Sequence, residues 1–292
     1  MSTSTIHDIG YRHYEGRRLG RAYVMRSLYV HNLRAAYGLG RPARAKVMPF
    51  LLVAIMLLPA AGSVAVYAIS KEADTLIRYS SYASTLSVII AIFVATQAPV
   101  LASRELRFHV VPLYFSRPVG HLDFVLAKQA AMATALFALT AVPITVLYLG
   151  GLVTRIPKSG EHLLHYLAAL VGCVLFAVVL GSIGMVVAAF TPRRGFGVAS
   201  VIAVFMLSTT IVAIVQGLAE MRTNFSLVGW AGLFSPFNLV DIVQVRLLGA
   251  KSSSIGIAPG TLGGLVALAL CAALVAGSTA VLYGRFRKAG LS

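Results

Sequence analysis

Charged side chains are scarce in this chain, and six long stretches contain no Asp, Glu, Lys or Arg at all. Charged residues make up 12% of the 292 residues, against roughly a quarter in soluble domains. A helix of about 20 apolar residues crosses the ~30 Å hydrocarbon core of a bilayer and satisfies its own backbone there. The sequence therefore predicts an all-α, polytopic membrane protein with six transmembrane helices. The predicted spans are 47–70, 79–102, 129–154, 163–192, 195–219 and 262–284.

Motifs for several kinds of chemistry are also missing. There is no Gly-x-x-x-x-Gly-Lys-Ser/Thr phosphate-binding loop and no Gly-x-Ser-x-Gly nucleophile elbow. No carboxylate lies within a span to relay protons. The two cysteines, Cys173 and Cys271, lie in spans and are expected to act as small buried apolar residues. Glu161, His162 and His165 can share a helix face, but without a further acidic partner an ordinary helix start is favoured over a metal site. We expect no catalytic residue, metal or cofactor on this chain.

The net charge of +16 is distributed unevenly along the chain. With the amino terminus placed in the cytoplasm, 18 of the 25 lysines and arginines fall on the inner side and 7 on the outer side. After the acidic residues are subtracted, the inner face carries +14 and the outer face +2. This positive-inside pattern predicts a multi-pass protein of the plasma membrane with both termini cytoplasmic. Contact with anionic membrane lipid explains the basicity without nucleic acid. No cleavable signal peptide is expected, because the first apolar run is full length and follows an Arg-rich segment.

Three segments are predicted along the chain. Residues 1–46 form a cytoplasmic amino-terminal segment, 47–284 the transmembrane domain, and 285–292 a cytoplasmic tail. Within 20–37, apolar residues recur at helical spacing and predict an amphipathic helix in the headgroup plane; a solvated basic helix is the alternative. Its apolar face comprises Ala22, Met25, Tyr29, Leu33 and Ala36.

The inner loop 103–128 is richer in large apolar residues than a plain connector needs. Charged and apolar residues alternate at helical spacing, so Leu106, Val110 and Leu113 can form one stripe. Pro112 is expected to bend or end the first helical piece. We interpret the loop as a short helix that docks on a cytoplasmic protein; a helix that merely lies on the membrane is the alternative. The candidate docking residues are Arg104, Glu105, Leu106, Arg107, Val110, Leu113 and Arg117.

Two further segments carry polar groups next to apolar ones. The outer segment 221–260 contains the single Trp, Trp230, and its pattern fits a dipping or interfacial helix pair. The fifth span brings aromatic and polar side chains to one side at helical spacing. This face is a candidate wall of a translocation path, and packing against a neighbouring helix is the alternative. Its members are Phe205, Ser208, Thr209, Val212 and Gln216.

Together these features resemble the membrane permease subunit of type-2 ABC transporters, the class that includes drug- and lipid-exporting permeases. The resemblance covers essentially the whole chain. It rests on the six spans, the amphipathic helix before the first span, the extended outer segment before the last, and four short motifs. These motifs are Arg104-Glu105, Ser116-Arg117-Pro118, Lys128 at the start of the third span, and the basic turn Pro192-Arg193-Arg194.

The resemblance implies a function. Two permease copies, or two related permeases, would pair with two separate ATP-binding subunits that carry ATP and Mg. The inner loop would be the coupling helix, and the chain would not be an enzyme by itself. Apolar span walls with hydroxyls and amides but no charge favour export of an amphipathic, drug-like or lipid-like compound. A non-transporting sensor or immunity subunit of an ABC complex, or a membrane enzyme, are the alternatives.

Overall fold

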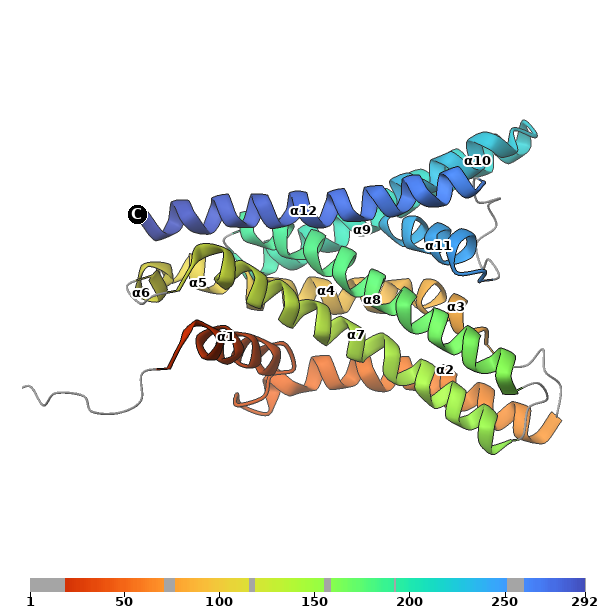
Figure 1. Ribbon diagram of the computed structural model, residues 1–292, viewed down its shortest axis with the longest axis horizontal. Helices are drawn as coiled ribbons and strands as arrows, with labels where there is room; N and C mark the ends of the chain where they lie inside the picture. Colours follow the sequence, from red (N-terminus) through yellow and green to blue (C-terminus); the bar gives the residue numbers. More distant parts are fainter. Residues whose placement is uncertain are drawn as a thin grey trace, which may run out of the picture.

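The structure is a computed structural model that describes residues 19–70, 77–115, 119–154, 159–191, 193–250 and 260–291. Over these residues the chain is all-α, with no strand (Figure 1). The helices are α1 (Arg21–Ala36), α2 (Arg44–Ser70), α3 (Tyr79–Thr85), α4 (Ser87–Leu101), α5 (Ser103–Arg107), α6 (Val111–Phe115), α7 (His121–Val153), α8 (Ser159–Phe190), α9 (Arg194–Met221), α10 (Phe225–Ala231), the 3-10 helix η2 (Gly232–Phe234), α11 (Pro236–Leu247) and α12 (Thr261–Leu291).

Five unbroken helices are long and apolar enough to cross a membrane: α2, α7, α8, α9 and α12. Two bent pairs pass the same test together, α3 with α4 and α10–η2 with α11, which allows up to seven spans. The predicted first, third, fourth, fifth and sixth spans each lie within one of the unbroken helices or overlap it. The second predicted span, 79–102, is the pair of α3 and α4, bent by 59°. The chain is therefore an all-α protein with several membrane-span-like helices, and the count of six stays a prediction.

The bend between α3 and α4 follows from the local sequence. The hydroxyl of Ser84 donates to the Ser81 carbonyl at 3.0 Å, and that of Ser81 to the Arg78 carbonyl at 3.1 Å. Such hydroxyls offer the backbone partners other than the helix ladder, and α3 is rich in them. The side chain of Tyr82 is fully buried and donates to the Met56 carbonyl of α2. These contacts fix α3 at an angle to α4.

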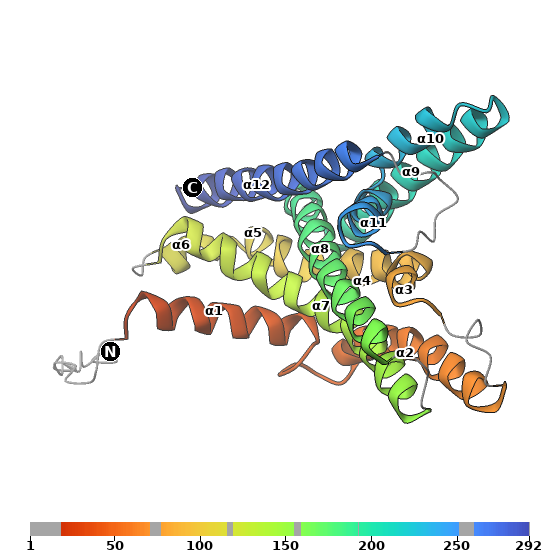
Figure 2. The ribbon, with the colours of Figure 1, turned by 45° about the vertical axis from the view of Figure 1, so that its right-hand side comes forward.

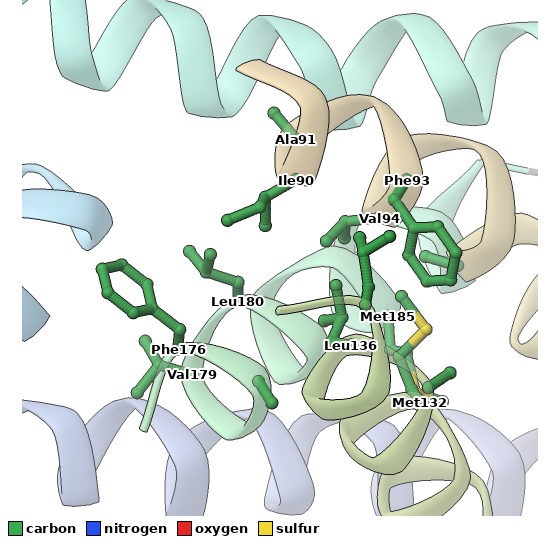
Figure 3. Packing of buried hydrophobic residues seen from close by; sticks show 14 of the residues in the cluster. Ile90, Ala91, Phe93, Val94, Met132, Leu136, Phe176, Val179, Leu180 and Met185 are labelled. Atoms are coloured by element: carbon green, nitrogen blue, oxygen red, sulfur yellow. The ribbon is translucent and has the colours of Figure 1, made fainter. Parts of the chain in front are cut away.

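The core lies where α4, α7 and α8 meet. Figure 3 shows Val94 of α4, Leu136 of α7 and Met185 of α8 around this contact. At Gly184 a Cβ atom would lie 2.2 Å from Val94 Cγ1, so only glycine allows α8 to approach α4 this closely. α9 and α12 lie further out and expose apolar side chains such as Leu207 and Leu265. Those exposed faces suit contact with lipid or with another membrane helix.

The two ends of the bundle differ. In both views, α1, α5, α6 and the last turns of α12 gather at one end, here called the loop end, while α3, α10 and α11 lie in the opposite half (Figures 1 and 2). α1 runs lengthwise beside the first half of α7. The hydroxyl of Tyr29 donates to Thr134 Oγ1 at 3.0 Å, and that of Tyr37 to the Ala135 carbonyl at 2.8 Å. α1 and the residue after it are thus tied to α7 by hydrogen bonds, and the orientation of α1 in the headgroup plane stays a prediction.

Candidate functional site

The loop between α4 and α7 contains two short helices, α5 and α6, with a sharp break between them. After α5 ends, His109 adopts a left-handed backbone with φ 50°. The Val110 amide donates to the Glu105 carbonyl at 3.2 Å and the His109 amide to the Leu106 carbonyl at 3.4 Å. This pair of hydrogen bonds is the Schellman motif that closes a helix, with His109 where glycine is usual. The predicted stripe therefore does not continue along one helix. Leu106 and Val110 are half-buried, whereas Leu113 is 69% exposed.

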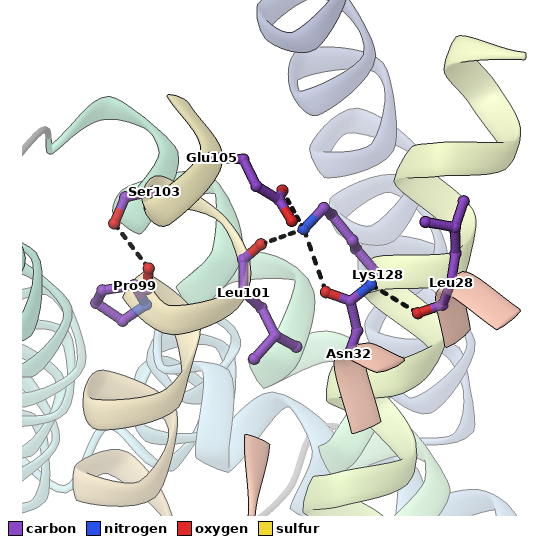
Figure 4. Close-up of polar contacts among 7 residues, drawn as sticks. All are labelled: Leu28, Asn32, Pro99, Leu101, Ser103, Glu105 and Lys128. Atoms are coloured by element: carbon purple, nitrogen blue, oxygen red, sulfur yellow. Dashed lines mark hydrogen bonds and ion pairs between the residues drawn. The ribbon is translucent and has the colours of Figure 1, made fainter. Parts of the chain in front are cut away.

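Beneath α5 lies a buried lysine with three polar partners (Figure 4). Lys128 Nζ of α7 donates to the Leu101 carbonyl at 2.6 Å and to Asn32 Oδ1 at 3.2 Å, and it forms an ion pair with Glu105. The Lys128 side chain is 1% exposed and that of Glu105 14%. A charge this deeply buried is tolerated only when it is paired and hydrogen-bonded. Lys128 thus joins α1, the end of α4, α5 and α7 at one point.

This placement changes the role open to Glu105. The sequence grouped Glu105 with the side chains that would meet a cytoplasmic partner. Its carboxylate instead turns into the bundle, because it neutralises Lys128. The neighbouring Arg104 and Arg107 are exposed, so the guanidinium groups of α5 remain on its open side. Arg117 lies outside the described residues. The part of α5 that is open to a partner is therefore basic.

A second ion pair fixes the start of α7. Arg21 of α1 donates to both carboxylate oxygens of Asp123, at 2.5 and 2.6 Å. The hydrogen bond that Arg21 donates to Asp123, aided by the charge of the carboxylate, raises the pKa of the Arg21 guanidinium above its ordinary value. Asn32 Nδ2 donates to the Leu28 carbonyl at 2.7 Å, which holds its Oδ1 toward Lys128. α1 is thereby attached to α7 by two charged groups of α7, Asp123 and Lys128.

Aromatic side chains attach α6 to the end of α12. The Phe115 ring stacks on His121 with centroids 4.0 Å apart, and Phe124 packs edge-on against Phe286 at 5.2 Å. Phe286 is fully buried. At Gly290 a Cβ atom would lie 2.6 Å from the Phe115 ring. The segment predicted as a tail is thus helical through Leu291 and packs against the loop.

Among the residues that the structure describes, the exposed charges of the loop end have one sign. The two described carboxylates there, Glu105 and Asp123, are taken up by Lys128 and Arg21. Phe108, which the sequence analysis did not single out, is 62% exposed on the same loop. Phe108 lies at the helix break after α5, and the sequence contains no Gly, Asn or Pro there that would have predicted this break. The exposed cations of this end, excluding α1 and the α1–α2 turn, are Arg104, Arg107, Arg193, Arg285, Arg287 and Lys288.

The candidate path residues of α9 are largely occupied with packing. Phe205 and Val212 are buried, and the Phe205 ring packs edge-on against Phe237 of α11 at 5.8 Å. Ser208 and Thr209 both donate to the Phe205 carbonyl of their own helix. Gln216 Nε2 donates to the Val228 carbonyl at 2.9 Å and so ties α9 to α10. Within one chain this face holds α9 against α10 and α11.

Other chemistry has little support among the described side chains. No three His, Cys, Asp or Glu residues there are placed to share a metal ion. No family model matches the chain, and no curated protein matches it.

Proposed function

We propose that this chain is the transmembrane permease subunit of an ABC transporter, with ATP and Mg bound and hydrolysed by a separate subunit. The observation that carries the proposal is the construction of α5. Its exposed side bears Arg104 and Arg107, while Glu105 on the same helix reaches back to the buried Lys128. A partner that engages the exposed side therefore acts on an element joined to α1, α4 and α7.

The proposed topology has six spans, with α3 and α4 as one bent span and α10–α11 as a helix pair that does not cross. The 119° bend between α10–η2 and α11 suits a pair that enters and returns on one side. The loop end then faces the cytoplasm, in keeping with the inner charge of +14. Both termini would be cytoplasmic, in the plasma membrane. The exposed Arg26 on α1 would reach anionic lipid headgroups.

A second permease, either another copy or a related chain, completes the proposed assembly. The packing of Phe205 and Val212 within one chain supports a path between two permeases over one inside a single permease. The exposed faces of α2, α9 and α12 are apolar, which suits an amphipathic, drug-like or lipid-like substrate. The direction of transport is proposed as export.

Co-purification tests the proposal. The chain would be expressed with candidate ATP-binding subunits and reconstituted in nanodiscs, and ATP hydrolysis measured with and without amphipathic compounds. We expect a stable complex whose hydrolysis rises with a transported compound, and Arg104→Glu with Arg107→Glu should weaken it. Arg222→Glu is the matched control, because Arg222 is an exposed cation at the far end of α9. A complex that is unchanged by the α5 reversals would remove α5 as the docking element. A complex without stimulated hydrolysis would instead favour a non-transporting subunit.

A further inference from the structure

The end of α12 presents a second basic and apolar surface beside the inner loop. Arg287, Lys288 and Leu291 are exposed there, Leu291 at 79%. Residues three and four apart on a helix are neighbours on one face, so both cations lie next to Leu291. α5 and the residues after it carry the same combination, with Arg104, Arg107 and the exposed Phe108.

The two surfaces are held in place through α7, because α12 packs on α6 and α7 and Glu105 of α5 forms an ion pair with Lys128 of α7. Phe286, on the other side of α12, is fully buried against Phe124, and Gly290 leaves room for the Phe115 ring of α6. The last turns of α12 therefore have a fixed position relative to α6. A partner that meets one surface meets the other in a defined geometry.

The depth of Leu291 favours a protein over lipid at this surface. α12 has 31 residues, a length of roughly 46 Å at ~1.5 Å per residue, and its apolar run ends near Tyr283. The turns beyond Tyr283 extend roughly 12 Å past the hydrocarbon, whereas the headgroup layer is only about 5–7 Å thick. Arg287 and Lys288 thus stand about 6 and 7.5 Å past Tyr283, at the outer edge of the headgroups, and Leu291 stands beyond them at about 12 Å. The exposed Leu291 beside them would be left in water without a protein partner.

We propose that the last two turns of α12 form, with α5 and α6, one composite docking surface for an acidic face of the ATP-binding subunit. This inference rests on the proposed function for the identity of the partner. Charge complementarity carries it, since the described carboxylates of the loop end are already paired with Lys128 and Arg21. The partner supplies Asp or Glu side chains around apolar pockets for Phe108 and Leu291.

Charge reversal on the intact chain in nanodiscs tests the inference. We expect Arg287→Glu with Lys288→Glu to weaken binding of the ATP-binding subunit about tenfold and to reduce its salt dependence. The α5 reversals should act similarly and Arg222→Glu should not. Weakening by the α5 variant alone overturns the role of α12 and leaves the proposed function standing. If an ATP-binding subunit binds but no variant weakens binding, the composite surface fails and the proposed function stands without it. If no ATP-binding subunit binds, the proposed function fails as well.

Two further measurements separate direct contact from other causes. A cysteine at Leu291 should be labelled readily and be protected when the partner binds, whereas one at Met221, 85% exposed in α9, should not be protected. Unchanged labelling of Leu291→Cys in the complex overturns the inference. The effect of the α12 reversal should persist in nanodiscs of phosphatidylcholine alone. Its disappearance there would assign Arg287 and Lys288 to anionic lipid and overturn the protein assignment.

Discussion

The buried ion pair of Lys128 and Glu105 allows a double-mutant cycle with a sharp expectation. Breaking a buried pair from one side costs about 3–5 kcal/mol, because a charge stays behind without its partner. For Glu105→Gln we expect the free energy of unfolding to fall by about 3 kcal/mol, at the lower end of this range, because the Glu105 side chain is 14% exposed and Gln keeps an acceptor. For Lys128→Met we expect about 4 kcal/mol, since the Leu101 carbonyl and Asn32 also lose their donor. The free energy of unfolding of the double variant should fall by about 5 kcal/mol, whereas the two single losses sum to roughly 7 kcal/mol. The difference of about 2 kcal/mol is the coupling energy of the pair.

The assay is unfolding of the purified chain in mixed micelles as the fraction of denaturing detergent rises. The single Trp, Trp230, lies in α10, in the half of the bundle opposite to α5 (Figure 1), and supplies the fluorescence signal. Arg104→Met is the matched control, because it removes an exposed cation from the same loop and should change stability by less than about 0.5 kcal/mol. If the losses of the two single variants simply add, Lys128 and Glu105 do not interact and the proposed link through α5 fails.

Three further outcomes are expected. His109→Val should lower stability by about 1–2 kcal/mol in the same unfolding assay while His109→Gly should not, because φ is 50° there and a β-branched residue resists that conformation; equal effects would contradict the left-handed helix end. Gly184→Leu should prevent folding in the same unfolding assay, since a Cβ at this position would already clash with Val94. Gly217→Leu should be tolerated, because no atom of a neighbouring element lies within 4 Å of a Cβ built there. Burial raises the pKa of Tyr37 to about 12, so the stability that its neutral hydroxyl contributes is complete below the usual pKa near 10 and is lost as pH rises toward 12. The unfolding midpoint of Tyr37→Phe should therefore fall less steeply with pH over that window than the midpoint of the unmodified chain, and identical slopes would contradict the shifted pKa.

The sequence predicted the helical class and most apolar helices, because about 20 uncharged residues leave few alternatives in lipid. It could not show which charges near a span face water. Lys128 was expected only to open the third span, and Glu105 to face a partner. Side chains at the boundary of an apolar run look alike in sequence, whether they point outward or neutralise each other. The pairing of Arg21 with Asp123, 102 residues apart, is equally a property of the folded chain.

Helix ends were predicted less well, for a similar reason. Sequence signals for a helix end are chiefly Gly, Asn and Pro, and His109 is none of these. Pro112 was expected to bend or end the first helical piece, but that piece ends before it, and Pro112 lies inside α6. The charged residues after Tyr283 suggested a tail. The helix continues because Phe286 buries its ring against Phe124, a contact invisible in a polar stretch.

The contacts of the loop end also determine how a displacement there would travel under the proposed docking. Lys128, Asp123 and the aromatic cluster join α1, α5, α6, the start of α7 and the end of α12, so these parts resist separate movement. α7 and α12 then continue unbroken for 33 and 31 residues. α4 is different, because the 59° bend interrupts its connection to α3. A displacement of the basic surface would therefore be transmitted to the far half of the bundle chiefly through α7 and α12, because these two continuous helices begin or end in the joined region.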